Sequence, residues 1–161
     1  MSEEKPYVVY LPKTDGLHVP QKLDRSTLSK WNTDIEDRVQ ELYTSNLGEP
    51  FILQWGPPYA SSPALHAGHL LNGTLKDILI KQHLNEGRKV EVRFGWDCHG
   101  LPIENAVKNR VGSDDKELLK RKCREFAAQS HHGQKAHFHL FGIYSTGSDY
   151  LTMDDDYEIG R

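Results

Sequence analysis

Two short apolar runs on either side of a helical pattern constrain the fold of this chain more than any other feature. The run "FILQW" at 51–55 is enclosed by prolines and glycine, which favours a buried strand over a helix. The run "KVEVRF" at 89–94 alternates apolar and charged residues, as a half-covered strand does. Between them, apolar residues recur at helical spacing until Asn85 and Gly87, namely Leu71, Leu75, Ile78 and Leu79.

The order strand, helix, strand predicts a βαβ unit, in which a right-handed crossover joins two parallel strands. The predicted fold class is therefore α/β. Ligands of such folds bind beyond the carboxyl ends of the strands, where the helix N-termini point. Residues 56–69 and 95–104 both fall at that edge, so we expect the functional residues there.

Two further helices and two irregular segments are expected outside this unit. Apolar residues recur at three- and four-residue steps between Asp24 and Tyr43, which predicts an amphipathic helix. Residues 1–22, with "YVVYL" as an extended piece, are expected to form a surface leader. A helix starting near Ser113 should bury Leu118, Leu119, Cys123, Phe126 and Ala127. A solvated polar stretch with four histidines and a short piece carrying Phe138 and Phe141 should follow.

The composition limits the classes of protein to which the chain can belong. It has 20 Lys and Arg against 23 Asp and Glu among 161 residues, so it lacks the general attraction for phosphates of a basic nucleic-acid binder. Its two cysteines do not form a disulfide framework, which indicates a reducing compartment and, by default, the cytoplasm. No secretion signal and no run of about 20 apolar residues is present, so we expect no membrane association.

His66 and His69 stand three residues apart where the helix of the βαβ unit begins. Residues at this spacing share one side of a helix, so both imidazoles should lie together at its first turn. Helix N-termini attract phosphate groups, and imidazoles can donate hydrogen bonds to phosphate oxygens. Gly68 adds close access to the backbone. This pattern indicates a site for a nucleoside triphosphate.

Other interpretations of these residues stay open. The histidines can be a capping or surface pair without a ligand, or metal ligands completed by Cys98 and His99. Adjacent residues on an extended segment point in opposite directions, so Cys98 and His99 cannot easily both bind a metal, and we expect no protein-bound metal here. At the histidines 131, 132, 137 and 139 we also expect none, because no H-x-x-x-H on a firm helix and no cysteine pair accompanies them. Asp97 can hold an ammonium group or cap a turn. Cys98 is expected to be a packing residue, because nothing near it marks an activated thiol.

Several motifs together resemble the class I aminoacyl-tRNA synthetases, and most closely their isoleucine-specific members. "HAGH" at 66–69 is shared by a wide nucleotidyltransferase superfamily, whereas "GWDCHGLPIE" at 95–104 is highly specific. The likeness covers nearly the whole chain, because further motifs follow the family's order: "VYLPKTD", "GPPYA", "KCREFAA" and "YLTMD". It implies the first half of a Rossmann-like nucleotide-binding fold of the HIGH type, with a helical extension over 1–50. Residues 51–161 would be a partial catalytic domain that stops near the family's editing insertion.

The resemblance also implies an activity and assigns residues to it. Such enzymes use ATP, with Mg²⁺, to convert isoleucine to isoleucyl-adenylate, and then transfer the acyl group to tRNA(Ile). His66 and His69 would be catalytic and bind the ATP phosphates, and Gly68 would lie under the adenine. Pro57 and Tyr59 of "GPPYA" would contact the amino acid, and Asp97 would hold its ammonium group. Trp96, with the turns at Gly95 and Gly100, would shape the wall of that pocket.

The chain departs from the family pattern at several positions. Trp55 replaces an acidic residue before "GPP", Ser61-Ser62 replaces an Asn-Gly turn, and one extra residue stands between Ala60 and His66. "FGIYSTG" at 141–147 lacks the family's tryptophan. The second signature, Lys-Met-Ser-Lys-Ser, does not occur in these residues, so we expect an incomplete half with weak or no activity alone, which a second chain would complete. A small nucleotidyltransferase of the HIGH superfamily and a non-catalytic, partner-binding remnant stay open as alternatives.

Overall fold

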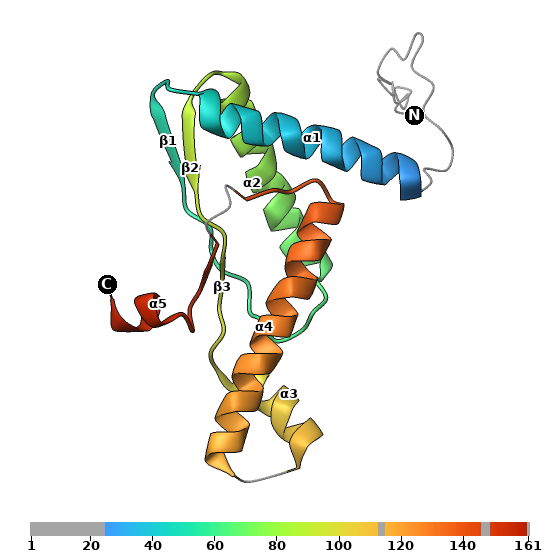
Figure 1. Cartoon of the computed structure of the whole chain (residues 1–161), viewed down its shortest axis with the longest axis vertical. Helices are drawn as coiled ribbons and strands as arrows, with labels where there is room; N and C mark the ends of the chain where they lie inside the picture. Colours follow the sequence, from blue (N-terminus) through green and yellow to red (C-terminus); the bar gives the residue numbers. More distant parts are fainter. Residues whose placement is uncertain (1–24, 113–114, 146–148, 161) are drawn as a thin grey trace, which may run out of the picture.

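The computed structural model of the chain describes residues 25–112, 115–145 and 149–160 (Figure 1). The expected surface leader at 1–22 and the helix-start residues Ser113 and Asp114 lie outside these ranges. The remaining predictions can be compared with the structure.

The predicted βαβ unit is present. Strand β1 spans Pro50–Leu53, helix α2 spans Ala67–Asn85 and strand β2 spans Lys89–Val92. The two strands are parallel, with Phe51 opposite Val90. The alternation in β2 is also confirmed, because its two valines are buried and its two charged residues are exposed. Helix α2 contacts both strands, as a crossover helix must.

The expectation that residues 51–55 form a buried strand is wrong for most of the run. Ile52 is 74% exposed, and Phe51 and Leu53 are only half-buried. Within the described residues β1 pairs with β2 alone, so it is an edge strand, and α2 covers a single face of it. Trp55, beyond the end of β1, is the member of the run that is buried.

Helix α2 turns a different face to the core than its apolar spacing suggested. Gly73, Ile80 and Leu84 are its buried residues. The residues whose spacing predicted the helix are all exposed, namely Leu71, Leu75, Ile78 and Leu79. The helix thus has apolar residues on two opposite sides, and the periodicity identified its existence correctly without identifying its inner face.

A central strand segment follows β2 and is bonded along both of its edges. Strand β3 spans Gly95–Trp96 and pairs in parallel with β4, Tyr150–Leu151. On the other edge, the Asp97 amide donates to the Pro58 carbonyl at 2.8 Å, and the Ala60 amide donates to the Asp97 carbonyl at 2.8 Å. Both stretches expected at the functional edge, 56–69 and 95–104, therefore meet at a parallel bridge between Tyr59 and Asp97.

Helices α3, Leu101–Val111, and α4, Lys116–Leu140, form a hairpin at the bottom of Figure 1, from which α4 runs upward alongside β3. Asp115 caps α4 by accepting hydrogen bonds from two backbone amides of its first turn. Phe126 and Ala127 are buried, as predicted, and the other expected core residues of this helix are half-buried. The short helix α5 spans Asp155–Ile159. None of the helices within the described ranges is long and apolar enough to span a bilayer.

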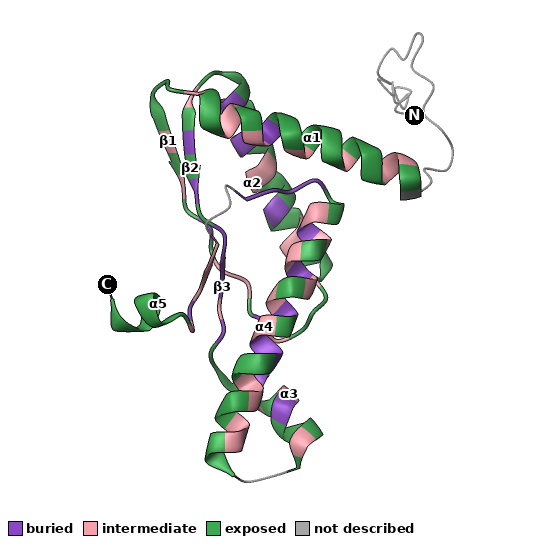
Figure 2. Cartoon of the chain, viewed as in Figure 1, coloured by how far each residue is buried: buried purple, intermediate pink, exposed green. Residues whose placement is uncertain are grey.

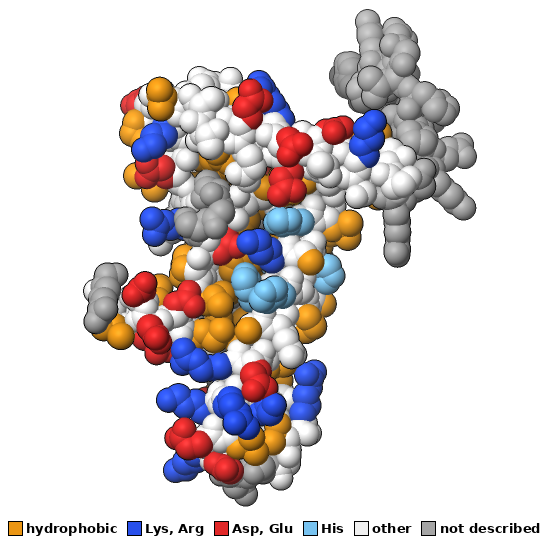
Figure 3. All heavy atoms as spheres, in the orientation of Figure 1, with side chains coloured by type: hydrophobic (Ala, Val, Ile, Leu, Met, Phe, Trp, Pro, Cys, Tyr) orange, Lys and Arg blue, Asp and Glu red, His pale blue; other side chains and the backbone are white. Residues whose placement is uncertain are grey.

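The solvated polar stretch expected after residue 130 is wrong, because α4 continues without a break to Leu140. Its histidines make contacts within the fold: the His131 ring lies edge-on to Trp96 at 4.4 Å, and the His139 ring lies 5.3 Å from Tyr144. Histidine side chains gather over the C-terminal half of α4, its upper part in the space-filling view (Figure 3). The helix persists because this side of it packs on the sheet and its loops, which outweighs the local polarity.

The predicted amphipathic helix is α1, Arg25–Ser45. Val39, in its second half, is buried in the core, whereas Trp31 is 46% exposed. Polar side chains fix it to the rest of the fold, because Gln40 Nε2 donates to the Ser145 carbonyl and Asn46 Nδ2 donates to the Leu84 carbonyl. The buried residues concentrate along β2, β3 and the facing side of α4 (Figure 2).

Candidate functional site

The loop between β1 and α2 begins at a buried aromatic cluster. The Trp55 ring stacks on Phe94 with centroids 3.8 Å apart and meets Phe138 edge-on at 5.7 Å. Lys76 Nζ lies 4.8 Å from the centre of the Trp55 ring, and burial lowers the pKa of this lysine. Trp55, which replaces an acidic residue of the family pattern, is therefore a core residue and anchors the first end of the loop.

The other end of the loop is anchored by His66, the N-cap of α2. Its Nδ1 accepts hydrogen bonds from the backbone amides of Gly68, at 3.1 Å, and His69, at 3.3 Å. A nitrogen that accepts two hydrogen bonds carries no proton, so the neutral ring holds its proton on Nε2. Two backbone amides expected to attract phosphate are thus occupied by the imidazole, and the Nε2 proton becomes the donor at this helix end.

The two imidazoles lie together, as their spacing predicted. The rings of His66 and His69 stack with centroids 3.7 Å apart and planes 20° from parallel. Burial, with a smaller contribution from His66, lowers the pKa of His69 below its usual value of 6.5. His69 Nδ1 is buried and has no hydrogen-bond partner among the described residues. At neutral pH His69 is therefore uncharged, and a nearby phosphate would stabilise its protonated form.

A cavity of about 420 Å³ lies in front of this pair. Of the residues predicted for the site, it brings together Pro57, Tyr59, His66, Gly68 and His69. It is also lined by residues that the sequence analysis did not assign to the site: Trp55, Gly56, Pro58, Asn72, Gly73 and Phe138. Asn72 could have been found, because it stands three residues after His69 on the same helix face. Phe138 could not, because no local pattern links it to the loop.

Asp97 and Trp96 lie beside this cavity and do not line it. The half-buried Asp97 is joined to the Tyr59 segment through its backbone, and its Oδ1 accepts a hydrogen bond from the His99 amide at 3.2 Å. This is the turn-capping geometry that the sequence left open. Trp96 has 0% exposure and its Nε1 donates to Gln134 Oε1 at 3.1 Å. Its side chain supports the site from beneath.

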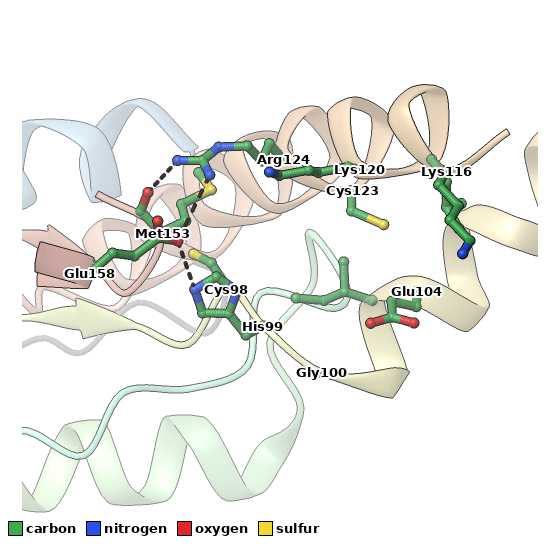
Figure 4. A pocket seen from close by; sticks show the side chains of 12 residues that line it. Cys98, His99, Gly100, Glu104, Lys116, Lys120, Cys123, Arg124, Met153 and Glu158 are labelled. Atoms are coloured by element: carbon green, nitrogen blue, oxygen red, sulfur yellow. Dashed lines mark hydrogen bonds and ion pairs between the residues drawn. The ribbon is translucent and has the colours of Figure 1, made fainter. Parts of the chain in front are cut away.

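The specific decapeptide leads into a second cavity of about 420 Å³, between α3, α4 and α5 (Figure 4). Lys116, Lys120 and Cys123 project from α4, opposite Cys98 and His99. Burial raises the pKa of both thiols, so Cys98 is a packing residue, as expected, and neither thiol is activated.

The metal alternative finds no support in this second cavity. His99 Nε2 lies 3.2 Å from the Thr152 carbonyl oxygen and 3.3 Å from a carboxylate oxygen of Glu158. Within residues 25–112, 115–145 and 149–160, no three side chains of His, Cys, Asp or Glu are grouped so as to hold a metal ion.

Comparisons with known proteins agree with this geometry. Residues 26–160 match the family profile described as tRNA synthetases class I (I, L, M and V). The isoleucine–tRNA ligase of Thermosynechococcus vestitus is 44% identical over 76% of this chain and 13% of its own length. That of Rippkaea orientalis is 38% identical over 100% of this chain and 18% of its own length. The chain thus spans less than a fifth of these curated relatives.

A solved structure shares the fold. It is the ternary complex of Agrobacterium radiobacter K84 agnB2 LeuRS with tRNA and LeuAMS, which superposes with a TM-score of 0.66 at 27% identity. The match covers 83% of this chain and 16% of that chain. The α/β fold with parallel strands, expected to be the first half of a Rossmann-like nucleotide-binding fold, is confirmed. With its motifs and nearly all of its length matched, the chain belongs to the class I tRNA synthetases.

Proposed function

We propose that this chain supplies the ATP- and isoleucine-binding half of an isoleucine–tRNA ligase. The observation that carries the proposal is the stacked pair of His66 and His69 at the start of α2, next to a segment bridged to Asp97. The curated relatives that are 38–44% identical over the aligned residues are named isoleucine–tRNA ligases, which supports isoleucine as the amino acid.

The proposed reaction has two steps. The isoleucine carboxylate attacks the α-phosphorus of ATP, which releases pyrophosphate and forms isoleucyl-adenylate. A hydroxyl of the terminal ribose of tRNA(Ile) then attacks the acyl carbon, and AMP leaves. In the first step, negative charge develops on the phosphate oxygens, where hydrogen-bond donors held in fixed positions stabilise the transition state.

Each residue of the site has a role in this proposal. The Nε2 proton of His66, together with His69, would bind the ATP phosphates, and Gly68 would allow the adenine to approach the backbone. Pro57 and Tyr59 would contact the isoleucine side chain, and Asp97 would pair with its ammonium group. Mg²⁺ would arrive with the ATP phosphates. Trp96, which is fully buried and bonded to Gln134, would fix the position of its neighbour Asp97 without touching the substrate.

We infer that catalysis needs a second half of the active site in addition to these residues. The half of the site that carries the family's Lys-Met-Ser-Lys-Ser signature would come from a further polypeptide segment or a complementing chain. Residues 1–50 would extend a partial catalytic domain at 51–161. The site of action would be the cytoplasm, which agrees with two free thiols at Cys98 and Cys123.

The test is calorimetry with ATP and with isoleucine, together with isoleucine-dependent pyrophosphate exchange. The 161-residue chain should bind ATP weakly, His69→Ala should abolish that binding, and tRNA charging should be negligible. Robust exchange by this chain alone would contradict its incompleteness. Absence of binding to either ligand would contradict the proposed site and favour the partner-binding remnant.

A further inference from the structure

Gln134, in the middle of α4, connects the two segments that carry the site. It is 1% exposed, and both ends of its amide are used. Its Oε1 accepts the hydrogen bond from Trp96 Nε1 at 3.1 Å. Its Nε2 donates to the carbonyl of Tyr59 at 2.9 Å and to the carbonyl of Ser62 at 2.7 Å. One side chain thus holds β3 and the loop before α2 at the same time.

Two neighbours of Gln134 continue this contact along the loop. A Cβ at Gly133 would lie 2.6 Å from the Pro63 carbonyl oxygen, so glycine is what allows the loop backbone to touch the helix. His137 Nδ1 accepts a hydrogen bond from the Leu65 amide at 3.4 Å. Gly133, Gln134 and His137, which we call the α4 template, therefore follow the loop from Tyr59 to Leu65, one residue before His66.

The template acts where this chain departs from its family. The two carbonyls that Gln134 holds bracket Ala60 and Ser61, and the Ser61-Ser62 pair replaces the family's Asn-Gly turn. Serine lacks the conformational freedom of glycine, and the chain has no residue other than glycine with a positive φ within the described ranges. The shape of the loop is therefore set by hydrogen bonds from α4, together with a local one in which Ser62 Oγ accepts from the Ala64 amide at 3.2 Å.

We propose that Gln134 is a positioning residue for the amino-acid side of the site, which fixes Pro57 and Tyr59 relative to Asp97. The identity of the ligand in this inference rests on the proposed function. The hydrogen bonds by which Gln134 connects the two segments do not depend on it. Only an amide can accept from an indole and donate to two carbonyls at once. Methionine has a similar shape, cannot donate and accepts only weakly.

The test compares Gln134→Met with Gln129→Met, an exposed position on the same helix. Hydrogen exchange of the ligand-free 161-residue chain should become about 10-fold faster at the Ala60 and Asp97 amides in Gln134→Met, since their bridge loses its support, whereas α4 amides keep their protection. The Kd for isoleucine should rise by about 10-fold and that for ATP by less than about 2-fold, because the His66 cap of α2 is intact. Gln129→Met should change none of these values.

Unchanged exchange at Ala60 and Asp97 in folded Gln134→Met would overturn the proposal, and so would equal losses of affinity for both ligands. If Gln134→Met does not fold, Trp96→Phe removes the indole donor and keeps an aromatic ring at this buried position. It should speed exchange at the Asp97 amide and leave the Leu65 amide of the loop, which donates to His137 Nδ1, protected. Equal gains in exchange at the two amides would overturn the inference. A wild-type chain that binds no isoleucine would contradict the proposed function alone, since the exchange measurements need no ligand.

Discussion

The segment at 94–98 and the loop at 56–65 form neighbouring parts of one site but are held in opposite ways. In the first, the Phe94 carbonyl accepts a hydrogen bond from the Tyr150 amide of β4 at 2.9 Å, and the Trp96 carbonyl accepts one from the Thr152 amide just after β4 at 3.0 Å. The side chains of Phe94 and Trp96 are both buried. In the second, most residues are partly or fully exposed, and side chains of α4 bind the backbone carbonyls.

This difference separates a fixed part of the site from an adjustable one. A buried strand with both edges paired keeps its geometry as long as the core is intact. A loop held by side chains from a distant helix changes when those side chains change, and its own residues can vary more freely. The position proposed for the ammonium group thus belongs to the strand, and the position proposed for the isoleucine side chain belongs to the loop.

The largest expected effect is on the strand. Trp96→Ala should lower the free energy of unfolding by about 3–5 kcal/mol, because it empties a fully buried site and leaves Gln134 Oε1 without its donor. Urea denaturation measures this loss. Trp31→Ala, at a side chain 46% exposed on α1, is the matched control and should cost less than about 1 kcal/mol. Similar losses for the two variants would remove the distinction between the buried strand and the surface.

A smaller effect is expected where the loop touches α4. Gly133→Ala should destabilise the fold by about 1–3 kcal/mol, because the new Cβ meets the Pro63 backbone at 2.6 Å. The sign of this change in stability is informative, because without the contact to the loop Gly133→Ala would stabilise the helix by about 1 kcal/mol. Thermal unfolding gives the comparison with Gly56→Ala, where nothing lies within 4 Å of an added Cβ. A stabilised Gly133→Ala variant would show that the loop does not rest on α4.

The end of the loop can be tested by separating two roles of one histidine. His66→Ala should cost about 0.5–2 kcal/mol, because α2 loses the acceptor at its N-cap. His66→Asn should restore most of that stability, since asparagine is a preferred N-cap, while ATP affinity stays reduced without the imidazole. Chemical denaturation and calorimetry on both variants measure the two roles independently. Full ATP affinity in His66→Asn would assign His66 to helix capping alone.

The sequence predicted the strand side of this comparison better than the loop side. Alternating burial in β2, parallel pairing and the start of α2 follow from local patterns, because side-chain period and caps are properties of adjacent residues. The inner face of α2 was not predictable, since this helix is apolar on two sides and only the packing decides between them. The length of α4 was not predictable either, because Gly133 and the neighbouring histidines form a local pattern that is typical of a helix end.

The candidate site also contains residues that the sequence predicted and residues that it did not. The pairing of His66 with His69 follows from their spacing, and Asp97 lies beside the loop because parallel strands end at one edge. Gln134 has no such signal, because it lies 72 residues beyond Ser62 and is one polar residue among many on α4. The role of Trp96 beneath the site also required coordinates, since an aromatic residue next to a ligand motif fits a pocket wall and a core equally well.

The smallest expected effect is a dependence of stability on pH at the helix end of the loop. The folded-state pKa of His69 is lowered by burial and by His66, so between this value and the unfolded pKa of about 6.5 the unfolded chain binds more protons. The stability contributed by neutral His69 is therefore complete above about pH 6.5 and is lost as pH falls.

His131, whose pKa burial also lowers, adds a loss of stability of the same sign. The contribution of His69 is therefore isolated by comparing the free energy of unfolding of wild type with that of His69→Gln between pH 7.5 and 5. The variant should show a shallower loss of stability than wild type, because it lacks the contribution of His69 and keeps that of His131, which packs on Trp96 of β3. Equal slopes for the two chains would mean that the buried position of His69 does not contribute to the pH dependence, which would then arise elsewhere in the fold.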